Sequence, residues 1–256
     1  METGLALKGR GIVITRPAHQ AGPVSQRLES LGATVLQFPL LGIAEPQNIA
    51  RSQQQLADLA QYDTLLFTSP NAVESALQKL GASIPESATI ACIGQKTAQS
   101  LVRFGVQVSI VPDAVFNSEA LLAEPEFQQM QGKRVAIIRG EGGRDLLKST
   151  LSLRGASVDY IDVYRRICPA HDLLPLLKFQ QGGQLDIIAL TSAESLRNLF
   201  TLAGGAAWLD GVALLLGSER MQLALKETTH HGPVHLAADP SDDSMYQALL
   251  DWARHL

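Results

Sequence analysis

The chain has 256 residues, of which 46% are hydrophobic and 18% charged, with a formal net charge of −4 at pH 7. This composition is typical of a globular protein that can bury two cores, and the acidic balance argues against general nucleic-acid binding. Cys92 and Cys168 have no CxxC spacing and are expected to be buried free thiols. The sequence shows neither a signal peptide nor an apolar run of roughly 20 residues, so a cytoplasmic protein is expected.

Short apolar runs alternate with segments of helical period, which predicts βαβ units and parallel sheets. The strands predicted from the apolar runs cover residues 11–15, 35–38, 64–67, 89–93, 108–111, 134–138, 158–163, 187–190, 212–216 and 234–236. The helices predicted between them cover residues 21–31, 48–60, 71–80, 96–104, 118–122, 144–153, 173–179, 195–202, 219–227 and 244–256.

The two halves of the chain nearly repeat each other. The run from Asp63 to Ser69 matches the run from Asp186 to Ser192 at a spacing of 123 residues (186 − 63). Arg16 and Arg139 keep the same spacing. Because the same spacing of 123 residues separates the matching segments in different parts of the chain, the sequence predicts two copies of one α/β unit. Two copies imply two lobes with a cleft between them.

Polar residues stand where the predicted strands end. In open parallel sheets, ligands bind beyond these carboxyl ends. The candidate substrate-binding residues at or near them are Thr15, Arg16, Thr68, Ser69, Asn71, Gly94, Lys96, Thr97, Arg139, Gly140, Arg144, Thr191, Ser192, Gly217 and Ser218. Helix N-terminal amides at such positions suit carboxylate or phosphate groups. The alternative, that the Ser, Thr and Asn residues are ordinary helix N-caps, stays open.

Several catalytic motifs are missing. The sequence has no P-loop, no HExxH, no GxSxG and no complete GxGxxG after the strand at 134–138. The pair His230-His231 falls in a polar segment and is expected to be a solvated loop. An enzyme of this kind would need neither a metal nor a cofactor, and would act by holding a reactive substrate in the right shape.

Other short motifs are present, and together they cover nearly the whole chain in a fixed order. They are residues 14–17, 31–33, 67–73, 93–98, 139–144, 155–156, 163–165, 190–192 and 217–218. In this order they resemble the motifs of the uroporphyrinogen-III synthase (HemD) family. Arg220 departs from that pattern, because the family often has a threonine there. Its guanidinium is expected either to bind a substrate carboxylate or to be solvated.

The resemblance implies an α/β fold of two similar HemD-like (flavodoxin-like) parallel-sheet lobes, joined by a two-stranded connector. Lobe one would comprise residues 1–37 and 169–256, and lobe two residues 42–164, with connectors at about 38–41 and 165–168. The repeat by itself fits a plain division into 1–125 and 130–256 equally well.

The resemblance also implies an activity, the cyclisation of hydroxymethylbilane with inversion of ring D and loss of water, in haem and sirohaem biosynthesis. Tyr164 matches the family tyrosine and is the candidate catalytic residue, since its phenol can donate a proton to the departing hydroxyl; the alternative is a structural tyrosine. The expected partner is the substrate alone, handed over transiently by the preceding pathway enzyme. No nucleic acid or membrane is expected, and the chain would be a monomer. The alternative function is a non-catalytic, two-lobed small-ligand-binding protein.

Overall fold

The computed structural model describes residues 5–169, 172–204 and 207–255. Residues 1–4, 170–171, 205–206 and 256, which the predicted first lobe includes, lie outside the described residues. The chain divides into two compact units. Unit 1 comprises Met1–Gly42 and Ile167–Leu256, and unit 2 comprises Ile43–Arg166.

Unit 1 contains a five-stranded parallel sheet in the order β10-β9-β8-β1-β2. Its strands are β1 (Gly11–Ile14), β2 (Thr34–Gln37), β8 (Ile187–Leu190), β9 (Ala213–Leu216) and β10 (Val234–Leu236). Every residue of β1, β8 and β9 is buried, which is why these segments read as continuous apolar runs in the sequence.

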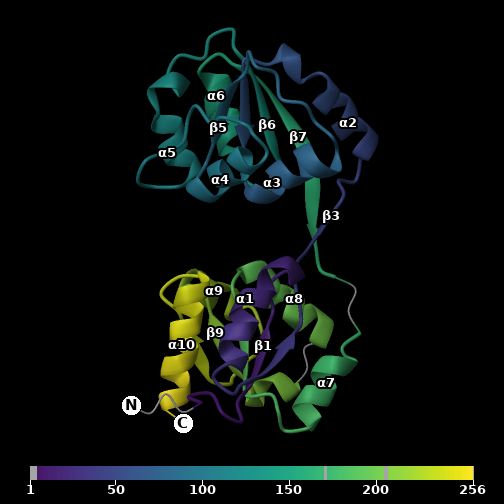
Figure 1. The fold of residues 1–256 in the computed structure, drawn as a ribbon, viewed down its shortest axis with the longest axis vertical. Helices are drawn as coiled ribbons and strands as arrows, with labels where there is room; N and C mark the ends of the chain where they lie inside the picture. The colour runs from purple at the N-terminus through teal and green to yellow at the C-terminus, as the bar shows by residue number, and fades with distance from the viewer. Residues whose placement is uncertain (1–4, 170–171, 205–206, 256) are drawn as a thin grey trace. The chain divides into compact units, whose positions relative to one another are not determined.

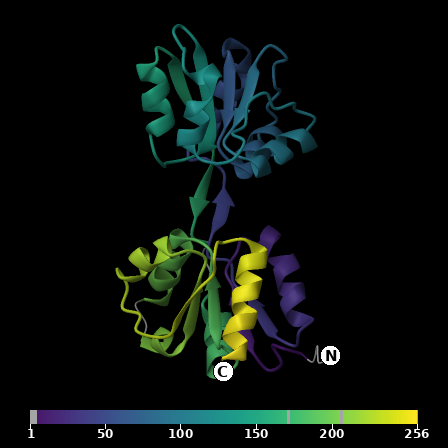
Figure 2. The same ribbon diagram turned by 90° about the vertical axis from the view of Figure 1, so that its left-hand side faces the viewer.

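Helices cover both faces of this sheet. They are α1 (Ala18–Glu29), α7 (Leu174–Gln181), α8 (Ala193–Ala203), α9 (Arg220–Leu225), α10 (Asp242–Arg254) and the 3₁₀ segment η4 (Ala207–Gly211). Ile12 and Ile14 pack with α1 and α10, whereas Val13 between them packs with α7, α8 and α9. Helices α1 and α10 lie side by side in both views (Figures 1 and 2).

Unit 2 contains a second five-stranded sheet in the order β3-β7-β6-β4-β5. Its strands are β3 (Gly42–Ala44), β4 (Thr64–Phe67), β5 (Thr89–Cys92), β6 (Arg134–Gly140) and β7 (Ser157–Ile167). The pairs β4–β5, β4–β6 and β6–β7 are parallel. The short strand β3 was not predicted as a strand, and β7 is longer than the predicted segment 158–163.

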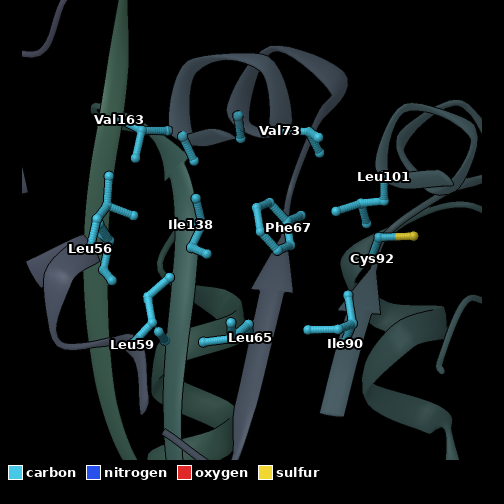
Figure 3. Packing of buried hydrophobic residues seen from close by; sticks show 14 of the residues in the cluster. Leu56, Leu59, Leu65, Phe67, Val73, Ile90, Cys92, Leu101, Ile138 and Val163 are labelled. Atoms are coloured by element: carbon cyan, nitrogen blue, oxygen red, sulfur yellow. The ribbon is translucent and has the colours of Figure 1, made fainter. Parts of the chain in front are cut away.

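The helices of unit 2 also form two layers. One layer holds α2 (Ile49–Ala57), η1 (Leu59–Gln61), α3 (Pro70–Glu74), the π-helical η2 (Ser75–Lys79) and α4 (Gln95–Arg103); the other holds α5 (Ser118–Ala123), η3 (Pro125–Phe127) and α6 (Leu146–Leu153). Phe67 packs in the first layer between Ile138 and Leu101 (Figure 3), and Leu66 packs in the second. Alternate strand residues thus fill opposite layers.

The two sequence copies exchange parts between the units. Strand β1 of the first copy pairs with β8 of the second, through Ile12 and Ile187. Strand β4 of the first copy pairs with β6 of the second, through Thr64 and Val135. Each unit therefore combines one piece from each copy, and a plain division at the middle of the chain does not describe the fold.

The predictions for residues 108–111 and for Cys168 are wrong. The segment predicted as a strand at 108–111 forms only an isolated bridge between Ile110 and Ala91. The N–H groups of Ser109 and Ile110 both donate to the carbonyl of Ile90, and Pro112, which has no N–H, follows. Cys168 is exposed because it lies just beyond the end of β7, while Cys92 is buried as predicted. No helix within the described ranges is long and apolar enough to span a membrane.

His230 does not lie in a solvated loop. Its side chain is only 9% exposed and packs edge-on against Phe200, with ring centroids 6.1 Å apart. Neither ring nitrogen has a hydrogen-bond partner among the described residues. Burial lowers the pKa of His230 below its ordinary value of 6.5, and this effect outweighs the backbone at Pro233 and the carboxylate of Asp210, which favour protonation. Only His231, which follows, is exposed as predicted.

Acid is therefore expected to destabilise the protein through His230. Below about pH 6.5 the unfolded chain protonates this histidine while the folded chain, with its lowered pKa, does not. The unfolded state then binds more protons, so stability falls as the pH falls. Urea unfolding at pH 7.5 and pH 5.0 should show a smaller loss for His230→Leu than for the wild type. Equal losses in the two proteins would contradict this assignment.

Candidate functional site

The candidate site lies at the carboxyl ends of β4 and β6 in unit 2. From β6 the chain crosses to β7 on one side, and from β4 it crosses to β5 on the other, so these two central strands mark the topological switch point. A cavity of about 230 Å³ opens there. Six of the predicted site residues line it, namely Thr68, Ser69, Arg139, Gly140, Arg144 and Tyr164.

An irregularity in the sheet places Tyr164 over Gly140. Arg139 is paired with Asp162, whereas Gly140 is paired with Tyr164, so Val163 is an extra residue in β7. The Tyr164 ring then packs directly on Gly140, where an added Cβ would lie 2.5 Å from the ring carbon Cζ. Tyr164 is 7% exposed and still lines the cavity. Its position thus depends on the absence of a side chain at residue 140.

Ser69 is both a helix cap and the partner of Tyr164. Its Oγ accepts a hydrogen bond from the Ala72 N–H at 3.1 Å, as an N-cap of α3 does. The same oxygen lies 3.2 Å from the Tyr164 hydroxyl, and either atom can donate. Beside it, the Thr68 hydroxyl donates to the carbonyl of Ile138 at 3.3 Å. Ser69 is therefore an N-cap of α3 that also lines the cavity.

Among the described residues that line the cavity, every charged side chain is cationic. These side chains are Arg139, Arg144 and Arg166. Arg139 Nε donates to Asp162 at 3.0 Å and is 13% exposed, while Arg144 forms an exposed ion pair with Glu119 at 3.1 Å. Both acidic partners lie outside the cavity wall. Guanidinium groups and hydroxyls in this arrangement suit a carboxylate ligand.

The predicted residues after β5 lie beside this cavity but do not line it. Gly94 is the N-cap residue of α4. Phe116 packs against Gly94, and a Cβ added to Gly94 would lie 3.2 Å from the Cβ of Phe116. Lys96 is exposed and Thr97 is buried. Asn71, in the first turn of α3, is half-buried and also lies outside the cavity wall.

In unit 1, the first two predicted residues are engaged in structural contacts. Thr15 is fully buried, and its hydroxyl donates to the Ala189 carbonyl at 2.7 Å, which links β1 to β8. Arg16 is 14% exposed and forms an ion pair at 3.0 Å with Asp242 in the first turn of α10. These contacts account for both residues without a ligand.

The remaining predicted residues of unit 1 belong to helix starts. Ser192 caps α8 by accepting from the Ser195 N–H, and Thr191 precedes it half-buried. Gly217 is buried, and a Cβ added to it would lie 2.9 Å from the Cβ of Pro240. Ser218, the next residue, is half-buried. Arg220 begins α9 and is exposed, in agreement with the solvated alternative.

Sequence reasoning missed three functional candidates, Tyr160, Asp162 and Arg166. Tyr160 and Arg166 line the cavity, and Asp162 holds Arg139. All three lie on β7, as does Tyr164. The sequence contained a pattern that points to these residues, because the polar and aromatic residues 160, 162 and 164 alternate with the apolar Ile161 and Val163, as residues on the two faces of a strand do.

Other features of unit 2 do not provide a better site. A larger cavity of about 770 Å³ contains none of the predicted residues, and apolar side chains such as Leu77, Ile84 and Phe104 line much of it. Glu86 is the one ionisable side chain among the described residues that line it. In the parts of the chain that the structure describes, no group of three or more His, Cys, Asp or Glu side chains could hold a metal ion.

Comparisons with known proteins agree on one family. The family model described as uroporphyrinogen-III synthase HemD matches residues 23–247. The chain is 31% identical over 244 residues to the uroporphyrinogen-III synthase of Escherichia coli (strain K12), covering 93% of this chain and 99% of that protein. It is 30% identical to the same enzyme of Synechococcus elongatus, covering 97% of each chain.

Solved structures show the shared fold. A mutant uroporphyrinogen III synthase from the extremely thermophilic bacterium Thermus thermophilus is similar with a TM-score of 0.63 at 23% identity, covering 96% of this chain and 99% of that one. The uroporphyrinogen-III synthetase of Helicobacter pylori 26695 is similar with a TM-score of 0.64 at 18% identity, covering 95% and 99%.

Proposed function

Because the chain belongs to the uroporphyrinogen-III synthase (HemD) family, the cyclising lyases of tetrapyrrole biosynthesis, we propose that the strand-end cavity of unit 2 binds part of hydroxymethylbilane while it cyclises. The observation that carries this proposal is the placement of Tyr164 beside Ser69, in a cavity whose charged side chains are arginines.

The charges of the cavity match those of the substrate. Hydroxymethylbilane carries eight carboxylates, whereas the protein has a net charge of −4, so the local field has to provide the attraction. Arg139 and Arg144 supply guanidinium groups, and Thr68 and Ser69 supply hydroxyls at the same strand ends. Such groups bind carboxylates through charge-assisted hydrogen bonds.

Tyr164 is proposed to assist the departure of water. The electron-rich terminal pyrrole expels its hydroxyl to give an azafulvene, and the Tyr164 phenol donates a proton so that this hydroxyl leaves as water. The substituted carbon of ring D then attacks the azafulvene methylene and forms a spiro intermediate. The bond between that carbon and the bridge from ring C breaks, and the bridge re-forms at the free α-carbon of ring D, so that the ring is inverted. The proton that this α-carbon loses balances the proton that Tyr164 donated. A pocket with oriented dipoles and little water favours this route over direct closure.

One assay tests the proposed function. Freshly prepared hydroxymethylbilane is incubated with the protein, and the cyclised isomers are separated and compared with a control without enzyme. The inverted type III isomer is expected in the presence of the protein, and the uninverted type I isomer in the control. Formation of the uninverted isomer alone would eliminate the enzyme and favour a non-catalytic ligand-binding protein.

Replacing Tyr164 with phenylalanine is expected to lower kcat by roughly ten- to a hundredfold, because the variant loses the proton donor but keeps the ring. Initial rates at saturating substrate measure the effect. Tyr62→Phe is the matched control, since Tyr62 is equally buried and its hydroxyl contacts Asp159 at 3.0 Å, outside the cavity wall. Unchanged turnover in Tyr164→Phe would remove Tyr164 from the mechanism.

The same proposal extends to the setting of the enzyme. It acts as a cytoplasmic monomer, with the substrate as its binding partner and transient hand-over from the preceding enzyme, and without membrane or nucleic-acid contacts. Sedimentation velocity tests the oligomeric state, and a stable dimer at assay concentrations would contradict it.

A further inference from the structure

The guanidinium of an arginine stacks on the aromatic ring of Tyr160 at the edge of the cavity. The guanidinium carbon of Arg139 lies 3.5 Å from the centroid of the Tyr160 ring. The Tyr160 hydroxyl donates to the carboxylate of Asp145 at 3.0 Å, just before helix α6 begins. Burial and this hydrogen bond raise the pKa of Tyr160, so the phenol keeps its proton and the anchor persists. The ring is thus tethered at its far end while its face holds the arginine.

Asp162 alone does not orient Arg139. Its carboxylate contacts Nε of Arg139 at 3.0 Å, but the Asp162 side chain is 38% exposed, so water screens the attraction. A planar guanidinium stacked on an aromatic face, by contrast, is fixed in its plane. The ring therefore fixes the plane in which the two Nη groups of Arg139 lie, and the Nε contact to Asp162 sets their direction within that plane.

Tyr160 belongs to the walls of two cavities, only one of which Arg139 lines. The second cavity, of about 440 Å³, shares Tyr160 with the first. Glu141, Asp159 and Asp162 supply carboxylates to the wall of this second cavity, whereas Arg139 lines only the first. Asp162 already contacts Arg139, and the Tyr160 ring opposes further movement of the guanidinium toward Glu141 and Asp159.

We propose that Tyr160 is a positioning residue that holds the guanidinium of Arg139 at the strand-end cavity, ready for a substrate carboxylate. This inference rests on the proposed function of the cavity. It assigns to Tyr160 a role in substrate binding through Arg139, without contact between Tyr160 and the reacting atoms.

The chain contains a matched control for this arrangement. In unit 1, Arg27 lies 4.1 Å from the centroid of the Tyr246 ring and contacts Asp243 at 2.7 Å. This second group of arginine, tyrosine and aspartate joins α1 to α10 and includes no predicted site residue. A general effect of losing an arginine–tyrosine stack would appear equally in both places.

The test compares Tyr160→Leu, Tyr160→Phe and Tyr246→Leu in steady-state assays with hydroxymethylbilane. Tyr160→Leu is expected to raise KM by roughly tenfold, as loss of a largely desolvated stack implies, with kcat little changed. Tyr160→Phe keeps the ring but loses the bond to Asp145, and should raise KM less than Tyr160→Leu does. Tyr246→Leu should leave both constants unchanged. An unchanged KM in Tyr160→Leu, or an equal rise in Tyr246→Leu, would overturn the proposal.

A double-mutant cycle separates positioning from general damage. In an Arg139→Ala background, Tyr160→Leu should cause no further rise in KM, because its effect passes through the missing arginine. A further rise of the same size would contradict this route. Thermal unfolding monitors the fold of each variant, and Tyr160→Gln, which stays polar at this half-buried position, replaces Tyr160→Leu if that variant does not fold.

The isomer analysis of the wild type distinguishes the two proposals. If the wild type yields only the uninverted isomer, the proposed function fails. If the wild type yields the type III isomer and Tyr160→Leu binds substrate equally well, only the role of Tyr160 fails.

Discussion

Replacing Gly140 with alanine is expected to lower the rate of type III isomer formation by about a hundredfold, the cost of misplacing a catalytic group by roughly an ångström. The added Cβ would lie 2.5 Å from Cζ and 2.9 Å from the hydroxyl oxygen of Tyr164. The backbone of both residues is held in the sheet, so the ring has to move. Movement of the ring separates its hydroxyl from Ser69, which lies 3.2 Å away in the wild type.

Activity and stability have to be measured together for this variant. Overpacking at Gly140 is expected to cost about 1–3 kcal/mol of unfolding free energy, so the protein should still fold. Gly211→Ala is the matched control, because no heavy atom lies within 4 Å of an added Cβ there. A Gly140→Ala protein with wild-type turnover would show that the position of Tyr164 does not matter for the reaction.

Gly11→Ala is expected to cost more than about 3 kcal/mol of unfolding free energy, beyond the usual range for overpacking. An added Cβ would overlap the carbonyl oxygen of Gln184, at 1.2 Å, and neither group is a flexible side chain. Gly11 also donates its N–H to the carboxylate of Asp186 at 2.8 Å and accepts from the Asp186 N–H at 3.0 Å. The clash therefore forces apart the start of β1 and the chain leading into β8.

Urea unfolding at pH 7.5 measures this effect, again with Gly211→Ala as the control. The control should stay within about 0.5 kcal/mol of the wild type, as surface substitutions usually do. A Gly11→Ala variant as stable as the control would mean that β1 and the Gln184 segment can separate without cost, contrary to the close approach of Gly11 to the Gln184 carbonyl.

The architecture of each sheet was largely predictable. Strands such as β4 and β8 are buried on both faces, so each reads as an unbroken apolar run, and the helices between them follow with a helical period. The failed strand at 108–111 has equally apolar residues. Its backbone donors converge on one carbonyl, which the pattern of side chains does not encode.

The candidate site was predictable in composition but not in geometry. Thr68, Ser69, Arg139 and Tyr164 each follow or end a predicted strand, so their shared sheet edge could be foreseen. The extra residue in β7 that sets Tyr164 against Gly140 could not be foreseen, because it depends on register between strands.

The sequence alone predicts an α/β protein built from two copies of one unit, with polar and cationic residues at the strand ends. It does not predict which pieces join, and the fold pairs β1 with β8 and β4 with β6. The two copies have similar strands, with the same apolar pattern and the same backbone hydrogen-bonding groups. Either partner would satisfy a strand locally, and the choice is made by contacts between segments far apart in the chain.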